Sequence, residues 1–241
     1  MSIPVKPIFL FADSQLLFWR DEDRPWLERV RREVDAARPK AAYVGASNGD
    51  QPEFYDLFRG AMESVGVTDC RMIPTEPSEE DVEYFGRADL VMLAGGEVRR
   101  GWRAFKKNGL RQKVIERYYA GAVLMGVSAG AVQLGLYGFH QDEESGKLKV
   151  FETFKLVPAL IDVHDEPDWA RLQRCLIRAG EDVRGLGIPS GAGAVLHQDL
   201  TLEPVRRSLV ELAQEEGEVK QSLIFPPGED GGDEIPPDAT E

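Results

Sequence analysis

The residues with the clearest capacity for chemistry are 126–130, which read Gly-Val-Ser-Ala-Gly. A strand-length apolar run, 123–125, comes directly before them, and Ala131 to Leu134 read as the first turn of a helix. A serine between a strand and a helix is held on a sharp turn with its hydroxyl exposed, and small neighbours avoid collisions across that turn. The helix start also offers free N–H groups where negative charge develops during acyl transfer. The pattern therefore predicts that Ser128 is a nucleophile.

A serine nucleophile needs a base to accept its proton, and the chain has three histidines. His164 closes the apolar run 160–163, so we expect it at the carboxyl end of a strand, the edge where open α/β sheets place their sites. His197 closes the run 194–196 and remains an alternative, whereas His140 lies in a polar stretch. We expect His164 to be the base.

The elements that must position these residues follow an α/β pattern, in which short apolar runs alternate with stretches of helical period. This pattern predicts a single doubly wound domain with a mostly parallel central sheet flanked by helices. The expected strands are 8–11, 41–45, 71–73, 89–93, 123–127 and 157–163, with a hairpin formed by 192–196 and 202–205. We expect a helix after Pro25, a helix at 54–62 whose inner face is Phe54, Leu57, Phe58 and Met62, and a helix that begins after Ser78. Two further helices are expected at 98–119, with a break at Asn108-Gly109, and at 169–177.

We assign residues 1–210 to this domain and 211–241 to an acidic C-terminal segment that is disordered from about residue 226, where prolines, glycines and acids dominate. The stretch 139–146 is polar and is predicted to be a loop. Trp102, Phe105, Tyr118 and Tyr119 are expected to pack in the core or in a subunit contact.

Composition limits the function classes. With 241 residues and 42% hydrophobic content, the chain can form one sizeable core. Its formal net charge of -13 argues against nucleic acid or an anionic membrane as the main partner. Cys70 and Cys175 lack the spacing of a metal site or a disulfide framework, which favours a cytoplasmic location. We expect no signal peptide and no membrane-spanning segment, because the given residues show neither the regions of a signal peptide nor an apolar run of spanning length.

Three motifs in order carry a family resemblance: Leu-Ala-Gly-Gly at 93–96, Gly-Val-Ser-Ala-Gly-Ala at 126–131, and Ile-Asp-Val-His at 161–164. Together they resemble the dipeptidase E and cyanophycinase family of serine peptidases over about residues 7–204. The resemblance implies a fold similar to class I glutamine amidotransferases, also described as flavodoxin-like, with serine in place of the amidotransferase cysteine. It also implies a small peptide or isopeptide-like substrate and no metal or organic cofactor. A homodimer is left open.

The resemblance also implies roles for individual residues. Ser128 matches the nucleophile and His164 the base, while the N–H groups of Gly96 and Ala129 match the oxyanion hole. Gly95, beside this hole, is expected to contact substrate. The acid of the triad comes from the segment between the serine and the histidine. We predict Glu143, with Asp142 as the main alternative and Glu144 and Glu152 also open.

The chain departs from the family pattern at three places. Glu97 replaces the usual asparagine after the Gly-Gly pair, and Pro189-Ser190-Gly191 stands where an acid is usual. The run 165–168, Asp-Glu-Pro-Asp, replaces aromatic and basic residues, so we expect Asp165 and Glu166 to contact substrate and to favour a basic or free-amino group. Arg99, Arg100 and Arg103 are either a carboxylate clamp or a solvated helix face.

Two other hypotheses remain beside the serine peptidase. One is a different amide or ester hydrolase with His197 as its base, because the base of an α/β-hydrolase lies far downstream of the serine. The other is a catalytically silent binding protein, which the altered 189–191 region and the unassigned acid motivate.

Overall fold

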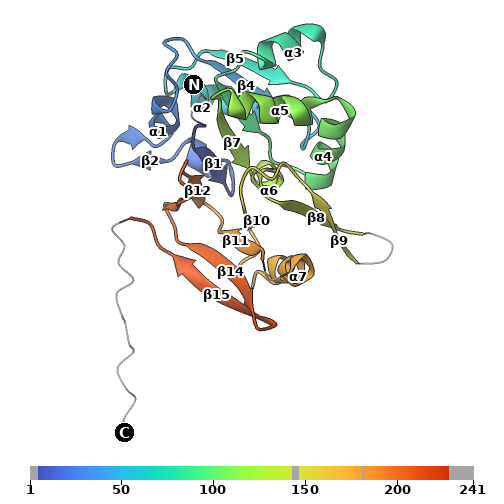
Figure 1. Cartoon of the computed structure of the whole chain (residues 1–241). Helices are drawn as coiled ribbons and strands as arrows, with labels where there is room; N and C mark the ends of the chain where they lie inside the picture. The colour runs from blue at the N-terminus through green and yellow to red at the C-terminus, as the bar shows by residue number, and fades with distance from the viewer. Residues whose placement is uncertain (1–4, 143–146, 181, 228–241) are drawn as a thin grey trace.

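A computed structural model describes residues 5–142, 147–180 and 182–227 (Figure 1). Its central sheet has seven strands in the order β13-β12-β1-β7-β6-β4-β5. The five strands from β1 to β5 in that order run parallel, and β12 and β13 are antiparallel. The strands are β1 (Ile8–Phe11), β4 (Lys40–Val44), β5 (Asp69–Ile73), β6 (Leu90–Leu93), β7 (Val123–Val127), β12 (Gly193–Leu196) and β13 (Leu202–Val205). The mostly parallel central sheet and the 192–205 hairpin predicted from the sequence are confirmed.

Helices cover both faces of this sheet, as the strand patterns require. Along β1, Ile8 and Leu10 pack into one core cluster, whereas Phe9 and Phe11 pack into another. A strand that alternates apolar side chains to two covered faces reads as a continuous apolar run. The helices are α1 (Glu28–Arg32), α2 (Pro52–Glu63), α3 (Glu79–Phe85), α4 (Val98–Lys107), α5 (Leu110–Tyr119), α6 (Ala129–Leu134) and α7 (Ala170–Ala179), with a 3-10 turn η1 at Ser14–Leu17.

Several predicted helix boundaries are confirmed. Ser78 caps α3 through a reciprocal capping box with Asp81. The break in 98–119 falls at Gly109, whose φ of 73° separates α4 from α5. Trp102 and Phe105 are buried as expected, whereas Tyr119 is 61% exposed.

The helix predicted directly after Pro25 is wrong. Pro25 belongs to β3 (Arg24–Pro25), which pairs with β2 (Arg20–Asp21), and α1 begins only at Glu28. The apolar residues Trp26 and Leu27 are buried nevertheless, so their spacing reflected core packing rather than a helix that starts at the proline.

A second sheet of four strands was not predicted. Its order is β10-β11-β14-β15, with β10 parallel to β11 and the remaining neighbours antiparallel. The strands are β10 (Leu160–Val163), β11 (Arg184–Ile188), β14 (Leu209–Glu215) and β15 (Glu218–Ile224). The strand before His164 therefore belongs to this second sheet and not to the central one.

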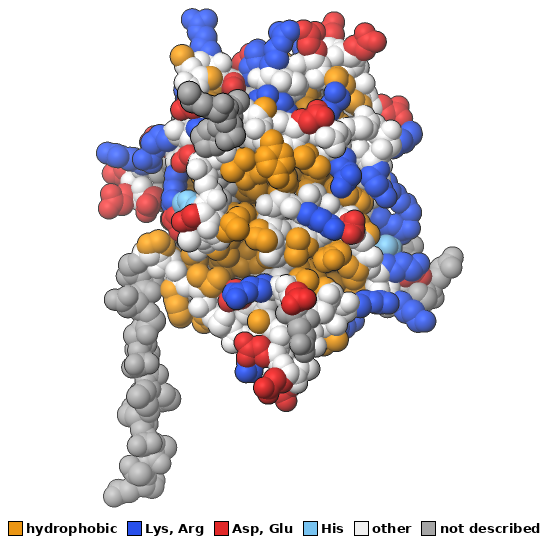
Figure 2. All heavy atoms as spheres, in the orientation of Figure 1, with side chains coloured by type: hydrophobic (Ala, Val, Ile, Leu, Met, Phe, Trp, Pro, Cys, Tyr) orange, Lys and Arg blue, Asp and Glu red, His pale blue; other side chains and the backbone are white. Residues whose placement is uncertain are grey.

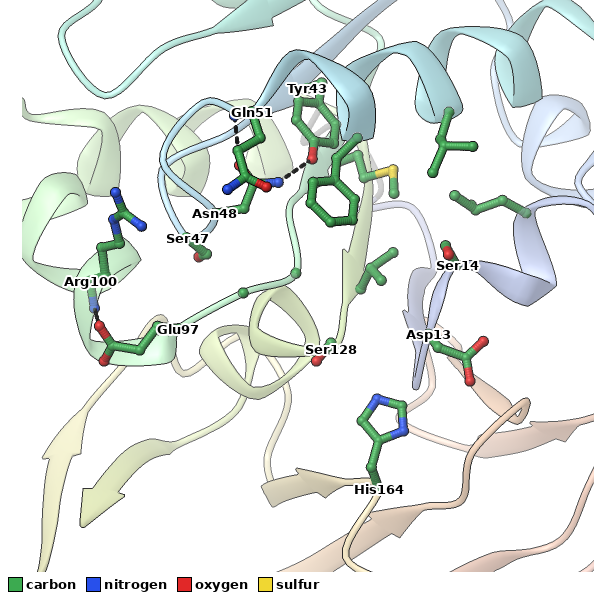
Figure 3. Close-up of a pocket in the computed structure, with 17 residues that line it drawn as sticks. Asp13, Ser14, Tyr43, Ser47, Asn48, Gln51, Glu97, Arg100, Ser128 and His164 are labelled. Carbon is green, nitrogen blue, oxygen red and sulfur yellow. Dashed lines mark hydrogen bonds between the residues drawn. The ribbon is translucent and has the colours of Figure 1, made fainter.

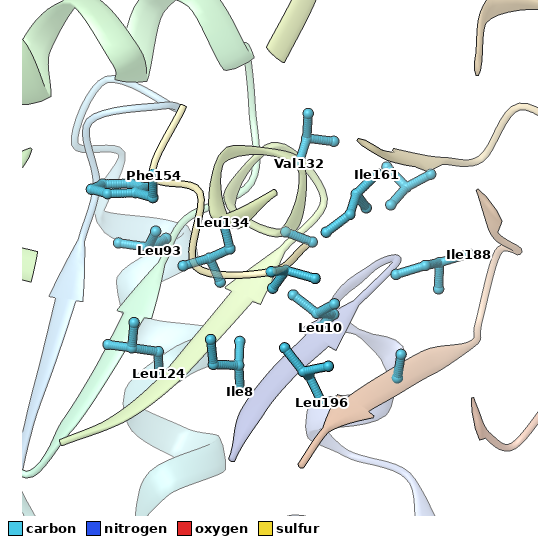
Figure 4. Close-up of a cluster of buried hydrophobic side chains, with 14 of the residues drawn as sticks. Ile8, Leu10, Leu93, Leu124, Val132, Leu134, Phe154, Ile161, Ile188 and Leu196 are labelled. Atoms are coloured by element: carbon cyan, nitrogen blue, oxygen red, sulfur yellow. The ribbon is translucent and has the colours of Figure 1, made fainter. Parts of the chain in front are cut away.

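The two sheets share one core, which makes the described chain a continuous packing unit. Ile161 and Ile188 of the second sheet belong to the same buried cluster as Leu10 and Leu124 of the central sheet (Figure 4). The boundary expected at residue 210 falls inside β14, which pairs with β11. Residues 211–224 thus belong to the second sheet, while 228–241 of the expected disordered segment lie outside the described residues.

The loop predicted over 139–146 is wrong for residues 139–141, which belong to a strand, and residues 143–146 lie outside the described residues. β8 (Tyr137–Gln141) pairs with β9 (Leu148–Glu152) in an antiparallel hairpin. Gly138 sits against the Phe151 ring, where a Cβ would lie 2.8 Å from Phe151 Cε2, so cross-strand packing of the apolar side chains stabilises the pair.

The surface separates charged from apolar side chains on the face seen in Figure 2. Hydrophobic side chains gather in its middle, and Lys, Arg, Asp and Glu lie mostly around the edge. No helix within the described ranges has the length and apolar character needed to cross a bilayer.

Candidate active site

Ser128 lies between β7 and α6, as predicted, on a turn with an uncommon backbone conformation. Its φ is 49° and its ψ is -111°, outside the regions that non-glycine residues ordinarily occupy. Such a conformation costs on the order of 1–3 kcal/mol and persists only where the surroundings enforce it. Ser128 N donates to Phe11 O at 2.9 Å, which ties the turn to the end of β1. The predicted order of strand, serine and helix is therefore confirmed.

The flanking glycines allow α6 to approach the sheet closely enough to form this turn. A Cβ on Gly126 would lie 2.6 Å from Ala131 N, and one on Gly130 would lie 2.1 Å from Leu93 O. Both distances are shorter than any carbon in a packed protein tolerates, and the obstructing atoms belong to the backbone. The glycines of 126–130 are therefore required by the packing of β6, β7 and α6.

Gly96 and Ala129, whose N–H groups are predicted to form the oxyanion hole, line the second cavity together with Ser128. Gly95 is in contact range, because a Cβ there would lie 3.4 Å from Ser128 Cβ. Gly96 has a φ of 127°, and its N–H donates no backbone hydrogen bond within the described chain. Ala129 is the first residue of α6, where an N–H has no acceptor inside the helix. Neither N–H group thus has a backbone acceptor among the described residues, which is the condition that the predicted oxyanion hole requires.

His164 lies across the same cleft from Ser128. Both residues line two neighbouring cavities, of about 520 Å³ and about 420 Å³. In Figure 3 the imidazole rises from the opposite side of the first cavity toward Ser128. His164 is exposed and has a φ of 59°, and it directly follows the last residue of β10. The structure thus brings together the predicted nucleophile and base, from two different sheets.

A buried ion pair holds the strand that carries His164. Asp162 is 1% exposed, and its carboxylate accepts from Arg171 Nε of α7 at 2.8 Å and from Val163 N at 2.8 Å. Burial raises the pKa of Asp162, and the Arg171 contacts oppose that rise. Arg171 Nη2 also donates to Val163 O at 3.3 Å. The backbone just before His164 is therefore fixed to α7, a contact that the sequence pattern did not reveal.

The polar neighbour of the imidazole is a hydroxyl. His164 Nδ1 lies 3.1 Å from Ser190 Oγ, in the loop after β11. Ser190 N donates to Glu166 Oε2 at 3.0 Å, and Gly191 N donates to Asp13 Oδ2 at 2.6 Å. The sequence did not identify Ser190 as a site residue, although the departure from the family pattern at 189–191 was the available signal.

The candidate acids of the triad either lie outside the described residues or form ion pairs with lysines. Glu143 and Glu144 lie outside the described residues. Asp142 forms an ion pair with Lys149 of β9. Glu152 pairs with Lys155 at 2.6 Å, which lowers the pKa of the Glu152 carboxyl. The identity of the acid stays a prediction.

Asp165 and Glu166, which were expected to contact substrate, serve as hydrogen-bond acceptors within the protein. Asp165 Oδ2 accepts from Arg171 N at 2.9 Å, and Glu166 pairs with Arg207 at 3.5 Å. Neither residue lines the two cavities that Ser128 and His164 share. The argument for a basic substrate group therefore gains no support from these contacts.

Glu97, which replaces the family's asparagine, has a structural use. Its Oε2 accepts from Arg100 N at 3.1 Å and so caps α4. Of the three arginines considered as a clamp, Arg100 lines the first cavity. Its guanidinium lies over Gly49, where a Cβ would be 2.3 Å from Nη2.

The other two histidines are placed differently. His197 follows β12, and its Nε2 lies 2.8 Å from Glu203 Oε2 of β13. His197 does not lie near Ser128, because β12 and β7 run in opposite directions and the two residues lie at opposite ends of the strands. His140 is on β8 and lines the second cavity, and burial together with Arg99 and Lys149 lowers its pKa.

Comparison with known proteins finds peptidases among the relatives of this chain. A curated relative, the uncharacterized peptidase YgaJ of Bacillus subtilis (strain 168), is 24% identical over 111 residues, which cover 46% of each chain, so the match spans about half of that relative's length. The crystal structure of a peptidase from an acI-B1 Actinobacterium superposes with a TM-score of 0.70 at 16% identity, covering 92% of this chain and 95% of that one.

A second structure, a putative Peptidase E protein from Listeria monocytogenes EGD-e, superposes with a TM-score of 0.55 at 15% identity and covers 91% of this chain and 99% of that chain. At these identities the superpositions establish the fold. The model of Peptidase family S51 matches residues 19–201, well over half of the sequence. The resemblance to dipeptidase E is thereby confirmed, and the chain belongs to Peptidase family S51.

Proposed function

We propose that this protein hydrolyses amide bonds in small peptides through an acyl-enzyme formed on Ser128. The observation that carries the proposal is the strained turn at Ser128, which lies at the N-terminus of α6 and shares two cavities with His164. Strain of this kind concentrates at functional sites. Membership in Peptidase family S51 supports the same reaction class.

In the proposed reaction, Ser128 Oγ attacks the substrate carbonyl while its proton moves to Nε2 of His164. The tetrahedral oxyanion accepts hydrogen bonds from the N–H groups of Gly96 and Ala129, each worth about 3 kcal/mol in related mechanisms. Collapse breaks the C–N bond, and Nε2 returns the proton to the leaving amine. Water then attacks the acyl-enzyme with His164 again as base, which releases the acid and restores Ser128.

This role for Nε2 requires the neutral tautomer with its proton on Nδ1. We propose that Nδ1–H donates to Ser190 Oγ and that Ser190 thereby positions the imidazole, because their separation is 3.1 Å. The hydrogen bond from Ser190 N to Glu166 holds that loop. An acid from 142–144, with Glu143 first, remains the alternative third member and is distinguished from Ser190 by mutation.

A fluorophosphonate probe tests the nucleophile directly. We expect it to label wild type on Ser128 and to leave Ser128→Ala unlabelled, with circular dichroism showing that both are folded. A library of dipeptides, tripeptides and isopeptide-linked amides then tests turnover. Hydrolysis that persists in Ser128→Ala would contradict the proposal, as would a folded wild type that neither reacts with the probe nor cleaves any member.

A further inference from the structure

The larger cavity beside Ser128 has one apolar wall. It occupies about 520 Å³ and opens between η1, α2 and the carboxyl ends of β4, β6 and β7. Its hydrophobic lining comes from residues of all five elements: Leu17, Tyr43, Phe54, Leu57, Met92 and Val127. Ser128 forms part of the boundary, so a group seated against this wall lies next to the attacking hydroxyl.

Two of the lining side chains are exposed in a way that helix packing does not explain. The sequence predicts Phe54, Leu57, Phe58 and Met62 as the inner face of α2, and Phe58 and Met62 are indeed buried. Phe54 and Leu57, however, are 46% and 43% exposed. They lie three residues apart on one side of the helix. The prediction that all four face the core is therefore wrong for the two that line the cavity.

Exposed side chains of this size lose the stabilisation that burial would give, and they regain it when a ligand covers them. Clustered apolar surface in a cavity beside reactive groups is typical of a small-molecule subsite. Phe54 and Leu57 are therefore placed to bury apolar atoms of a substrate rather than of the protein.

The polar groups nearest this wall are already hydrogen-bonded. Tyr43 Oη accepts from Asn48 Nδ2 at 2.8 Å, and burial raises the Tyr43 pKa to about 12, so the phenol is neutral at physiological pH. Asp13 accepts from Gln15 N at 2.8 Å through one oxygen and from Gly191 N at 2.6 Å through the other. Tyr43 therefore offers no charge to a substrate, whereas the Asp13 carboxylate, whose two partners are neutral N–H groups, keeps its negative charge at the cavity.

Charged residues lie on two opposite sides of the cavity. Figure 3 shows Glu97 and Arg100 together, across the cavity from Asp13 and Ser14. Glu97 caps α4, and the Arg100 guanidinium packs over Gly49. The apolar wall thus shares the cavity with charged groups on both of these sides.

We propose that the wall formed by Leu17, Tyr43, Phe54, Leu57, Met92 and Val127 is the acyl-side subsite, and that it takes a large apolar side chain such as Leu, Met or Phe. The side chain would belong to the residue whose carbonyl Ser128 attacks. This assignment rests on the proposed function, because it presumes attack by Ser128. It replaces the expectation of a basic substrate group.

The test uses a matched series of fluorogenic amides that differ only in the acyl residue: Leu, Phe, Ala, Asp and Lys. We expect wild type to have a kcat/KM for Leu or Phe at least about tenfold above that for Ala, since a few methylenes in an apolar pocket discriminate by that order. The Asp and Lys substrates are expected to fall below Ala. A preference for Asp or Lys would overturn the assignment.

Substitutions on α2 test whether Phe54 and Leu57 cause the preference for a large apolar acyl residue. Phe54→Ser and Leu57→Ser should each lower the ratio of kcat/KM for Leu over Ala by about fivefold. Phe18→Ser is the matched control, because Phe18 is 50% exposed on the neighbouring turn and does not line the cavity, and its ratio should equal that of wild type. An unchanged ratio in both α2 variants would also overturn the assignment.

Labelling by fluorophosphonate separates the two levels of the proposal. If Ser128 is labelled but the Leu and Phe amides are not preferred over the others, the subsite is refuted and the peptidase proposal stands. Folded protein that is not labelled and is inactive on every amide refutes the peptidase and the subsite with it.

Discussion

His164 and His197 look alike in the sequence and differ completely in the structure. Each follows a four-residue buried strand, β10 or β12. His164 faces a cavity that it shares with Ser128, whereas His197 is bonded to Glu203, which also accepts from both terminal nitrogens of Arg29. Under the proposed function, His164 transfers protons, whereas His197 links β12 to Glu203 of β13.

Strand direction explains the difference. β12 runs antiparallel to β1, so Leu196 lies opposite Ile8 at the start of β1. β7 runs parallel to β1, so Val127 lies opposite Phe11 at its end. His197 and Ser128 therefore lie at opposite ends of the strands of the central sheet. A local pattern of apolar strand followed by histidine carries no information about direction, and only the sheet topology supplies it.

The sharpest test of this comparison is loss of activity. We expect His164→Ala to lower kcat/KM by on the order of 10³-fold or more, because Ser128 then lacks its base. Steady-state kinetics on a Leu amide measure the effect, with thermal denaturation as a check on folding. Full activity in His164→Ala, or its loss in His197→Ala alone, would reverse the two assignments.

Ser190→Ala tests whether the Ser190 hydroxyl positions the imidazole of His164. We expect kcat/KM to fall by about tenfold, since one hydrogen bond worth about 1–1.5 kcal/mol is removed. Ser190→Thr should restore most of the loss, and the pH–rate profile of Ser190→Ala should move, which a purely structural role would not cause. If Glu143→Gln or Asp142→Asn costs far more than Ser190→Ala, the third member of the triad is the acid.

His197→Ala should act on stability rather than on catalysis. It removes the contact of Nε2 with Glu203, and we expect the free energy of unfolding to fall by about 1 kcal/mol. Urea denaturation measures this change, and kcat/KM should stay within about twofold of wild type. A large kinetic effect without a change in stability would contradict the structural role.

The smallest expected effect is on how the stability of the fold changes as the pH falls below neutrality. Hydrogen bonds from Arg29, and secondarily from His197, lower the pKa of Glu203 below its ordinary value. A carboxyl of this kind stabilises the fold above its unfolded pKa, and that contribution is lost as pH falls through the lowered folded pKa.

Thermal denaturation between pH 7 and pH 3 measures this contribution. Glu203→Gln should be less stable than wild type at pH 7, and the gap should narrow toward pH 3. A gap that is constant with pH would show that the Glu203 charge contributes nothing.

Part of the fold follows from local patterns in the sequence. The runs at 8–11 and 123–127 form strands where predicted, and Ser78 and Gly109 bound helices as predicted. The second sheet escaped prediction because β14 and β15 are rich in charged and polar residues, which look like a solvated tail until they pair with β11 and with each other. Pairing across distant segments has no local signature.

The site, like the fold, has some residues that local sequence patterns reveal and others that only long-range packing places. Gly126 is required by atoms of Gly130 and Ala131 within the same turn, so this glycine has a local cause. Gly130 and Gly96 are required by the backbone of Leu93 and Ser47, which lie far away in the sequence, but both glycines belong to short motifs that can be recognised without those contacts. The sequence by itself therefore determined the turn that carries Ser128, the proposed nucleophile, and the glycines next to it.

Only the tertiary structure decided which histidine faces Ser128, which hydroxyl contacts that histidine, and which apolar side chains are left uncovered. His164 and Ser190 reach the cleft from the second sheet, while Phe54 and Leu57 reach it from α2. Their positions depend on the register and direction of strands that are far apart in the chain. Such long-range geometry arises from the whole core, so no stretch of the sequence can specify it alone.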